Sequence, residues 1–141
     1  MRHPFDVLTS HNPVTERKYH ISPQRWLGEM RTLRRLIDSG RKRLLIVTYE
    51  ELATSPESTA MKIARSFDLP PLKEPAQVMA SAVLPPEAVS AMGGLRPIDR
   101  DSIGRYRKDP ESLAYLRKAV PILREELDWV AGYFGYDLSL A

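Results

Sequence analysis

The chain opens with a short run of residues of the kind that bind anions. Arg2 and Ser10 stand eight positions apart, with Pro4 and Asp6 between them. An arginine presents a planar fork of donors that suits phosphate and sulfate, while a serine hydroxyl and the N–H groups at a helix N-terminus add further donors. The alternative is an ordinary strand-to-helix turn in which Asp6 caps the helix. The run therefore favours phosphate binding without requiring it.

Two later runs stand out in the same way. Residues 45–52 form an apolar stretch that ends in Tyr49 and two glutamates, and the Ser55-Pro56 pair follows. Residues 94–107 are rich in arginine and glycine and contain Gly-Leu-Arg-Pro followed by Ser-Ile-Gly-Arg-Tyr-Arg.

In this order the runs resemble motifs of sulfotransferases that use 3′-phosphoadenosine-5′-phosphosulfate (PAPS), from the 3′-phosphate-binding motif onward. The resemblance implies that Arg2 and Ser10 hold the 3′-phosphate and that Tyr49 approaches the adenine. It also implies phosphate contacts from the third run, where Tyr106 stands in place of the usual tryptophan. These contacts are Arg96, with Ser102 and Arg107 second. The alternatives are that Tyr49 only closes a sheet edge and that the other three are surface loop residues.

The resemblance covers the later part of that family and leaves out its earlier part. None of the seven glycines lies in a strand–loop–helix context that would cradle a 5′-phosphosulfate, and no G-x-x-x-x-G-K-[ST] loop occurs. The family's catalytic base and its assisting lysine also precede the 3′-phosphate motif. We therefore expect a partial domain over residues 1–141 that contributes the 3′-phosphate and adenine half of a PAPS site. The implied reaction is sulfuryl transfer to a hydroxyl or amine, with weak or no turnover by the chain alone.

Other chemistry receives little support from the residues. His11 follows Ser10 and is a candidate general base, although a hydrogen-bonded or exposed structural histidine is the alternative. The three histidines are 8 and 9 residues apart, which is not a metal-ligand spacing, so no metal is predicted. The absence of cysteine excludes disulfides and thiolate sites and fits a reducing cytoplasm.

The elements that must position these residues begin with a helix over about 23–39. Ser22 is its expected N-cap, Pro23 takes the first helical position, and Gly40 suits the left-handed site after the end. Six apolar residues at helical spacing form its inward stripe. They are Trp26, Leu27, Met30, Leu33, Leu36 and Ile37.

Residues 43–49 contain four consecutive apolar residues and predict a strand covered on both faces, as in a parallel sheet. A short helix is expected from Ser55-Pro56 to about Ser66. Its inward residues are Ala60, Ile63, Ala64 and Phe67. Residues 70–101 are rich in proline and predict a long loop with one helix near 75–83.

The last predicted element is a helix that begins at Asp109-Pro110 and stops at Gly135. Pro121 lies inside it and must kink or divide it near Val120. Its inward face is expected to carry Leu113, Leu116, Val120, Leu123, Leu127, Val130 and Phe134.

The resemblance implies an α/β fold class: the C-terminal part of a P-loop-like three-layer fold, mainly helical with one or two parallel strands. A lone strand cannot pair its own backbone groups, so a second copy or a complementary chain is expected to pair with residues 43–49. This leaves an alternative function, a non-enzymatic helical interaction or oligomerisation protein on a degenerate sulfotransferase scaffold.

Charge and hydropathy narrow the partners further. The net charge is only +3, and the basic cluster at 31–43 is interrupted by Asp38 and contains no aromatic residue, so nucleic-acid binding is disfavoured. No apolar run approaches the length of a membrane span. The resemblance implies that the partner is the nucleotide PAPS or its product PAP, the corresponding 3′,5′-bisphosphate.

Overall fold

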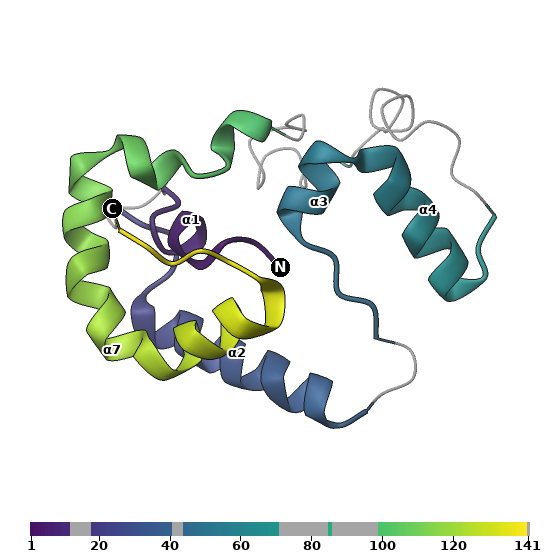
Figure 1. The fold of residues 1–141 in the computed structure, drawn as a ribbon, viewed down its shortest axis with the longest axis horizontal. Coiled ribbons are helices and arrows are strands. Elements are labelled where there is room, and N and C mark those ends of the chain that lie inside the picture. The colour runs from purple at the N-terminus through teal and green to yellow at the C-terminus, as the bar shows by residue number, and fades with distance from the viewer. Residues whose placement is uncertain (12–17, 41–43, 71–84, 86–98, 141) are drawn as a thin grey trace. The chain divides into compact units, whose positions relative to one another are not determined.

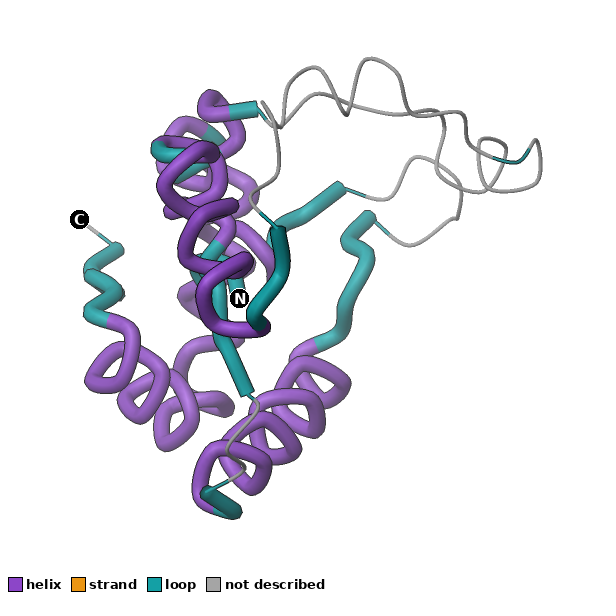
Figure 2. The backbone as a smooth tube through the Cα atoms, turned by 90° about the vertical axis from the view of Figure 1, so that its right-hand side faces the viewer, coloured by secondary structure: helices purple, strands orange, loops and turns teal. Residues whose placement is uncertain are grey.

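The computed structural model describes residues 1–11, 18–40, 44–70, 85 and 99–140. The described elements are α-helices and two 3-10 helices, η1 (Arg100–Ser102) and η2 (Arg105–Lys108), and no strand occurs in these ranges (Figures 1 and 2). The chain divides into two compact units, which are described separately below. One contains Met1 and residues 45–100, and the other contains residues 2–44 and 101–141. Within the described ranges, no helix has the length and hydropathy needed to cross a membrane.

The larger unit is built from three helices and η2. These helices are α1 (Pro4–Leu8), α2 (Pro23–Asp38) and α7 (Pro110–Phe134). The predicted start of α2 is confirmed, because Ser22 Oγ accepts the N–H of Arg25 and Pro23 occupies the first turn. Gly40 follows the helix with φ +64°, which is the left-handed conformation expected of it.

The core of the larger unit forms where α1, α2 and η2 pack on α7. Most of its side chains are almost fully withdrawn from water, and each one buried contributes about 1.5–3 kcal/mol. They are Phe5, Leu8, Trp26, Met30, Tyr106, Leu116, Ala119, Leu123, Leu127 and Val130. Only Trp26 and Met30 of the predicted α2 stripe are fully buried, whereas its other members, including Leu33 and Leu36, are half-buried.

Helix α7 runs from Pro110 to Phe134 without interruption, and Pro121 lies inside it. Figure 1 shows that the helix changes direction near its middle. A proline inside a helix removes one backbone hydrogen bond and crowds the preceding turn, which bends the helix without necessarily ending it. Of the two outcomes predicted for Pro121, the structure shows the bend and not the division. Gly135 ends the helix with φ +72°, as predicted.

The smaller unit contains α3 (Tyr49–Thr54) and α4 (Pro56–Phe67). The two helices pack on each other through small residues, with Ala53, Thr59, Ala60 and Ala64 buried. The prediction that Phe67 faces inward is wrong, because the residue is 42% exposed. Asp68 ends α4 in the left-handed conformation with φ 54°, one residue beyond that ring. The helix predicted near 75–83 lies outside the described residues.

The predicted strand over 43–49 is not present in the described residues 44–49. Residues 44–48 adopt no regular structure, and Tyr49 already belongs to α3. Thr48 and Glu51 form a capping box, a strong local signal that starts a helix at this point. A strand also needs a neighbour for its backbone groups, and in the described ranges only Met1 pairs with this segment.

The contact with Met1 has the pattern of parallel pairing. The α-amino group of Met1 donates to the carbonyl oxygen of Val47 at 2.6 Å, and the Met1 carbonyl accepts the N–H of Tyr49 at 2.6 Å. In a parallel ladder, one residue forms hydrogen bonds with the two neighbours of the residue opposite it. Met1 forms such bonds with the two neighbours of Thr48. Burial lowers the pKa of the Met1 amino group, although Glu50 and Glu51 partly oppose this effect.

Candidate functional site

One open pocket of about 340 Å³ in the larger unit contains both residues predicted to hold a phosphate. We call it the Arg2 pocket. Its lining consists of Arg2, Val7, Ser10, His20, Ile21, Arg25 and Glu29. Two arginines face one glutamate in it, so the fixed charges of the pocket favour an anion.

Short-range structure brings Arg2 and Ser10 together. Arg2 lies two positions before Pro4, the first residue of α1, and Ser10 follows the Thr9 C-cap of that helix. The five residues of α1 make little more than one helical turn, so the residues that flank it remain close in space. The spacing between Arg2 and Ser10 therefore consists of the short helix α1 and its two cap residues, His3 and Thr9.

A second stretch of chain supplies the rest of the pocket lining, from His20 to Glu29. His11 and Tyr19 form an isolated antiparallel bridge, and the N–H of His20 donates to the carbonyl oxygen of Ser10 at 2.9 Å. This pairing sets His20 and Ile21 beside Ser10. The chain then enters α2 at Pro23, whose first two turns carry Arg25 and Glu29 into the lining.

The guanidinium group of Arg2 reaches a residue 100 positions away. Its Nη2 donates to the backbone carbonyl oxygen of Ser102 at 2.7 Å. Ser102 was predicted as a phosphate contact, and the structure brings it to Arg2, although through its carbonyl group. An acceptor on one edge of the guanidinium fixes the plane of the fork, which orients Arg2 at the pocket wall.

Asp6 has a different role from the cap considered in the sequence. The cap of α1 is His3, whose Nδ1 accepts the N–H of Phe5 at 3.2 Å. Asp6 lies inside the helix, is 3% exposed, and accepts the backbone N–H of Gly104 at 2.8 Å. The alternative reading, in which Asp6 caps the helix, is therefore wrong, because that acceptor position is already filled by an imidazole nitrogen.

Arg107 belongs to a cluster of aromatic and polar residues and does not line the Arg2 pocket. Its Nε donates to the hydroxyl oxygen of Tyr106 at 3.0 Å, and its Nη2 lies 3.4 Å from a carboxylate oxygen of Asp137. His3 stacks on the Tyr106 ring with centroids 5.3 Å apart. Its Nε2 donates to the Asp137 carbonyl oxygen at 3.0 Å. The predicted phosphate contact of Arg107 is thus not supported by its position.

Two pKa shifts follow from this cluster. Burial of its phenol raises the pKa of Tyr106, although the hydrogen bond from Arg107 opposes that effect. The pKa of Asp137 is lowered, chiefly because its carboxylate accepts the backbone N–H of Ser139, with a further contribution from the Ser139 hydroxyl. The raised pKa of Tyr106 means that its neutral phenol is favoured, and the lowered pKa of Asp137 means that its charged carboxylate is favoured. In these forms both side chains hold Arg107 in place.

Of the remaining predicted site residues, none lines the Arg2 pocket in the described structure. Tyr49 lies in the smaller unit, where its hydroxyl donates to the Asp99 carbonyl at 3.0 Å and accepts the Asp99 N–H at 3.1 Å. His11 is exposed beside the pocket. Arg96 lies outside the described residues.

Sequence reasoning missed His20, Arg25 and Glu29 as pocket residues. Arg25 and Glu29 stand on the polar side of a helix predicted from its apolar stripe, and such a side is ordinarily solvated. A signal for His20 was available, because the turn-forming dipeptide Asn12-Pro13 lies between Ser10 and His20. It indicates that the two flanking stretches come back together.

The arrangement has the chemistry of an anion-binding site. Arginine, serine and histidine donors surround the Arg2 pocket, while the described residues contain no group of three or more histidine, aspartate and glutamate side chains placed to hold a metal ion. Comparison with known proteins adds no assignment: no protein-family model, curated protein sequence or solved structure matches the chain.

Proposed function

We propose that this protein binds the adenosine 3′-phosphate end of PAPS or PAP at the Arg2 pocket. In this proposal the chain supplies the 3′-phosphate and adenine half of a sulfotransferase site, for sulfuryl transfer to a hydroxyl or amine acceptor. The observation that carries it is the placement of Arg2 and Ser10 in one pocket, with Arg2 bonded to the Ser102 carbonyl. Segments of the first and third motifs, 100 positions apart at this contact, meet where a phosphate is expected.

The chemistry of the pocket supports a phosphate ligand. A guanidinium group can give two parallel hydrogen bonds to phosphate oxygens, and such charge-assisted bonds are about twice as strong as neutral ones. Ser10 adds a hydroxyl donor at the same wall. Neither side chain transfers the sulfuryl group; both would hold the nucleotide in position, which is the part of catalysis that depends on orientation.

The proposed fold is the α/β three-layer arrangement of this family. The parallel backbone pairing of Met1 with the residues flanking Thr48 supports it. In that arrangement the apolar run that leads to Tyr49 would lie in a parallel sheet. We place the protein in the cytoplasm, since a chain without cysteine needs no oxidising compartment.

The test is a comparison of PAP with AMP, which lacks the 3′-phosphate. Isothermal titration at neutral pH is expected to show PAP binding more tightly than AMP by about tenfold or more, since hydrogen bonds to charged groups contribute about 1.5–3 kcal/mol. Ser10→Ala and Arg2→Lys are expected to reduce this preference. Arg35→Ala is the matched control, because Arg35 is exposed on α2 and does not line the pocket.

Either of two results would overturn the proposal. One is the absence of PAP binding at millimolar concentration. The other is equal affinity for PAP and AMP. Sulfuryl transfer by the purified chain is expected to be weak or absent, because none of its glycines lies in a context that would cradle a 5′-phosphosulfate. A robust rate of acceptor sulfation would contradict that expectation but would leave the nucleotide site standing.

One observation favours the alternative of a non-enzymatic interaction protein. In the described ranges, backbone pairing of the 44–48 segment is with Met1, and the side chain of Leu44 is 41% exposed. A second chain could extend such pairing by adding a strand. Size-exclusion chromatography with light scattering distinguishes the two: a stable dimer that does not respond to PAP supports the interaction protein.

A further inference from the structure

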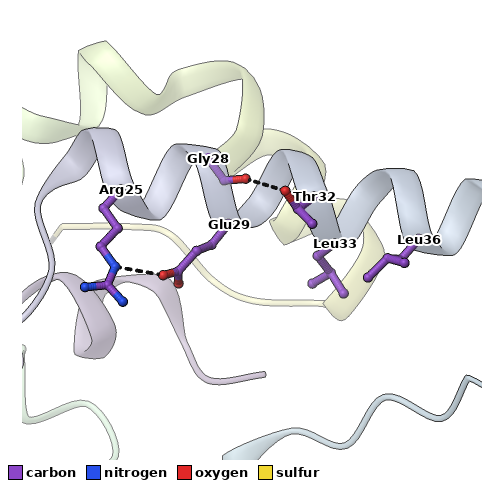
Figure 3. Close-up of a pocket in the computed structure, with 6 residues that line it drawn as sticks. All are labelled: Arg25, Gly28, Glu29, Thr32, Leu33 and Leu36. Carbon is purple, nitrogen blue, oxygen red and sulfur yellow. Dashed lines mark hydrogen bonds and ion pairs between the residues drawn. The ribbon is translucent and has the colours of Figure 1, made fainter.

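The α2 face of the Arg2 pocket contains a carboxylate as well as an arginine. Arg25 Nε and Glu29 Oε1 lie 3.0 Å apart, one helical turn from each other. Both residues also line a neighbouring pocket of about 420 Å³ on the same helix, together with Gly28, Thr32, Leu33 and Leu36. Figure 3 shows Arg25 and Glu29 projecting from the same side of α2, with the ion pair drawn between them.

This ion pair is weakly held. The side chains of Arg25 and Glu29 are 72% and 50% exposed, and exposed pairs one turn apart on a helix contribute little to stability. Water and salt screen the attraction, and both long side chains can leave the pairing at small cost. Arg25 is therefore able to exchange its carboxylate partner for a stronger one.

A phosphate monoester in the pocket is such a partner. It carries close to two negative charges at neutral pH and presents three acceptor oxygens, whereas the Glu29 carboxylate carries one charge and two oxygens. A phosphodiester or a sulfate ester carries a single charge and offers Arg25 no clear advantage over Glu29. Competition between the ligand and Glu29 for Arg25 thus favours dianionic ligands over monoanionic ones.

We propose that Arg25 is a second cationic ligand of the phosphate in the Arg2 pocket, and that Glu29 makes the site selective for a dianionic phosphate monoester. This inference rests on the proposed function, because it assigns further residues to the same phosphate. In the empty site Glu29 holds Arg25 on the helix surface. On binding, Arg25 turns to the phosphate opposite Arg2, and Glu29 is left to solvent.

The experiment measures the affinity for PAP of the wild type, Arg25→Ala and Glu29→Gln. Arg25→Ala is expected to weaken binding about tenfold through loss of a charge-assisted hydrogen bond, and Glu29→Gln to strengthen it about threefold by removing a competing charge. Arg35→Ala and Glu125→Gln are the matched controls, since both residues are exposed and lie outside the pocket. Their affinities are expected to stay within about twofold of wild type.

Selectivity is measured with 3′-AMP, a dianionic monoester, and 2′,3′-cyclic AMP, its monoanionic diester. The wild type is expected to prefer 3′-AMP, and Glu29→Gln to reduce that preference by about threefold. If Arg25→Ala binds PAP as tightly as wild type does, the inference is overturned while the proposed function stands. If Glu29→Gln changes neither affinity nor preference, the selective role of Glu29 is overturned. If wild type binds no PAP, both proposals fall.

Discussion

The carboxylate of Asp6 accepts a hydrogen bond from the backbone N–H of Gly104, with Oδ2 and N 2.8 Å apart. Asp6 is 3% exposed, and its contact lies close in sequence to the Arg2–Ser102 bond. Together these two bonds fasten residues 102–104 to the segment that contains α1. They join parts of the chain about a hundred residues apart, and one of the two bonds is made by Arg2, which lines the pocket.

Asp6→Ala is expected to lower the free energy of unfolding by about 1–3 kcal/mol, because it leaves the Gly104 N–H without its buried acceptor. Asp6→Asn keeps an acceptor oxygen and removes a buried charge, so its loss should be less than half as large. Denaturant unfolding measures both. Asp128→Ala is the exposed control, and an Asp6→Ala loss no greater than that of this control would contradict the anchoring role.

Adjacent residues of α7 provide a second test of the core. Leu123 is fully buried and Ile122 is 64% exposed. Leu123→Ala is expected to destabilise by about 2–5 kcal/mol through lost burial and a residual cavity, whereas Ile122→Ala should change stability by about 0.5 kcal/mol or less. Thermal and denaturant unfolding would detect the difference. Similar losses at the two positions would mean that α7 is rotated from the orientation described.

Two glycines with open space around them should respond in opposite ways to alanine. A Cβ at Gly28 or Gly104 would meet no atom within 4 Å, but Gly104 has φ +70° and Gly28 lies inside α2. Gly28→Ala is expected to stabilise by about 0.5–1 kcal/mol, and Gly104→Ala to destabilise by about 1–2 kcal/mol. Melting temperatures should therefore move in opposite directions. A shift of the same sign in both variants would contradict the assigned backbone conformations.

The start of α7 predicts an acid-sensitive component of stability. Asp109 caps the helix, and its pKa lies below the ordinary 3.8, chiefly because its carboxylate accepts the Ser112 hydroxyl hydrogen. A lowered pKa means that the charged form is favoured in the folded state. This stability is present above pH 3.8 and is lost as the pH falls further, through the folded-state pKa. The melting temperatures of wild type and Asp109→Asn should differ above pH 3.8 and become similar below the folded-state pKa of Asp109.

Tyr49→Phe tests whether the hydroxyl fastens Asp99 in the smaller unit. The change removes one hydrogen bond donated to the Asp99 carbonyl and one accepted from its N–H, while leaving the ring in place. A loss of about 1–3 kcal/mol is expected, with faster exchange of the Asp99 amide hydrogen. An unchanged exchange rate would show that other contacts hold Asp99.

The helices were predictable because the signals that start and end them act over a few residues. Each signal acts on backbone hydrogen bonds within one turn. The helix starts are set by Ser22 with Pro23 and by Asp109 with Pro110, and the end of α7 is set by Gly135. The strand over 43–49 was predicted from a run of four consecutive apolar residues, and such a run cannot supply the neighbour that a strand needs. At its end the Thr48–Glu51 capping box is the stronger local signal, and a helix begins at Tyr49.

In the candidate site, too, some features follow from the local sequence and others depend on tertiary packing. The sequence by itself determined that Arg2 and Ser10 stand eight positions apart, and the structure shows that the short helix Pro4–Leu8 lies between them. Only the tertiary structure decided that Ser102 contacts Arg2, that Arg25 lines the same pocket, and that Arg107 does neither. Contacts between distant segments depend on how α1, α2 and η2 pack on α7, and packing is a property of the whole buried surface and not of any local run of residues.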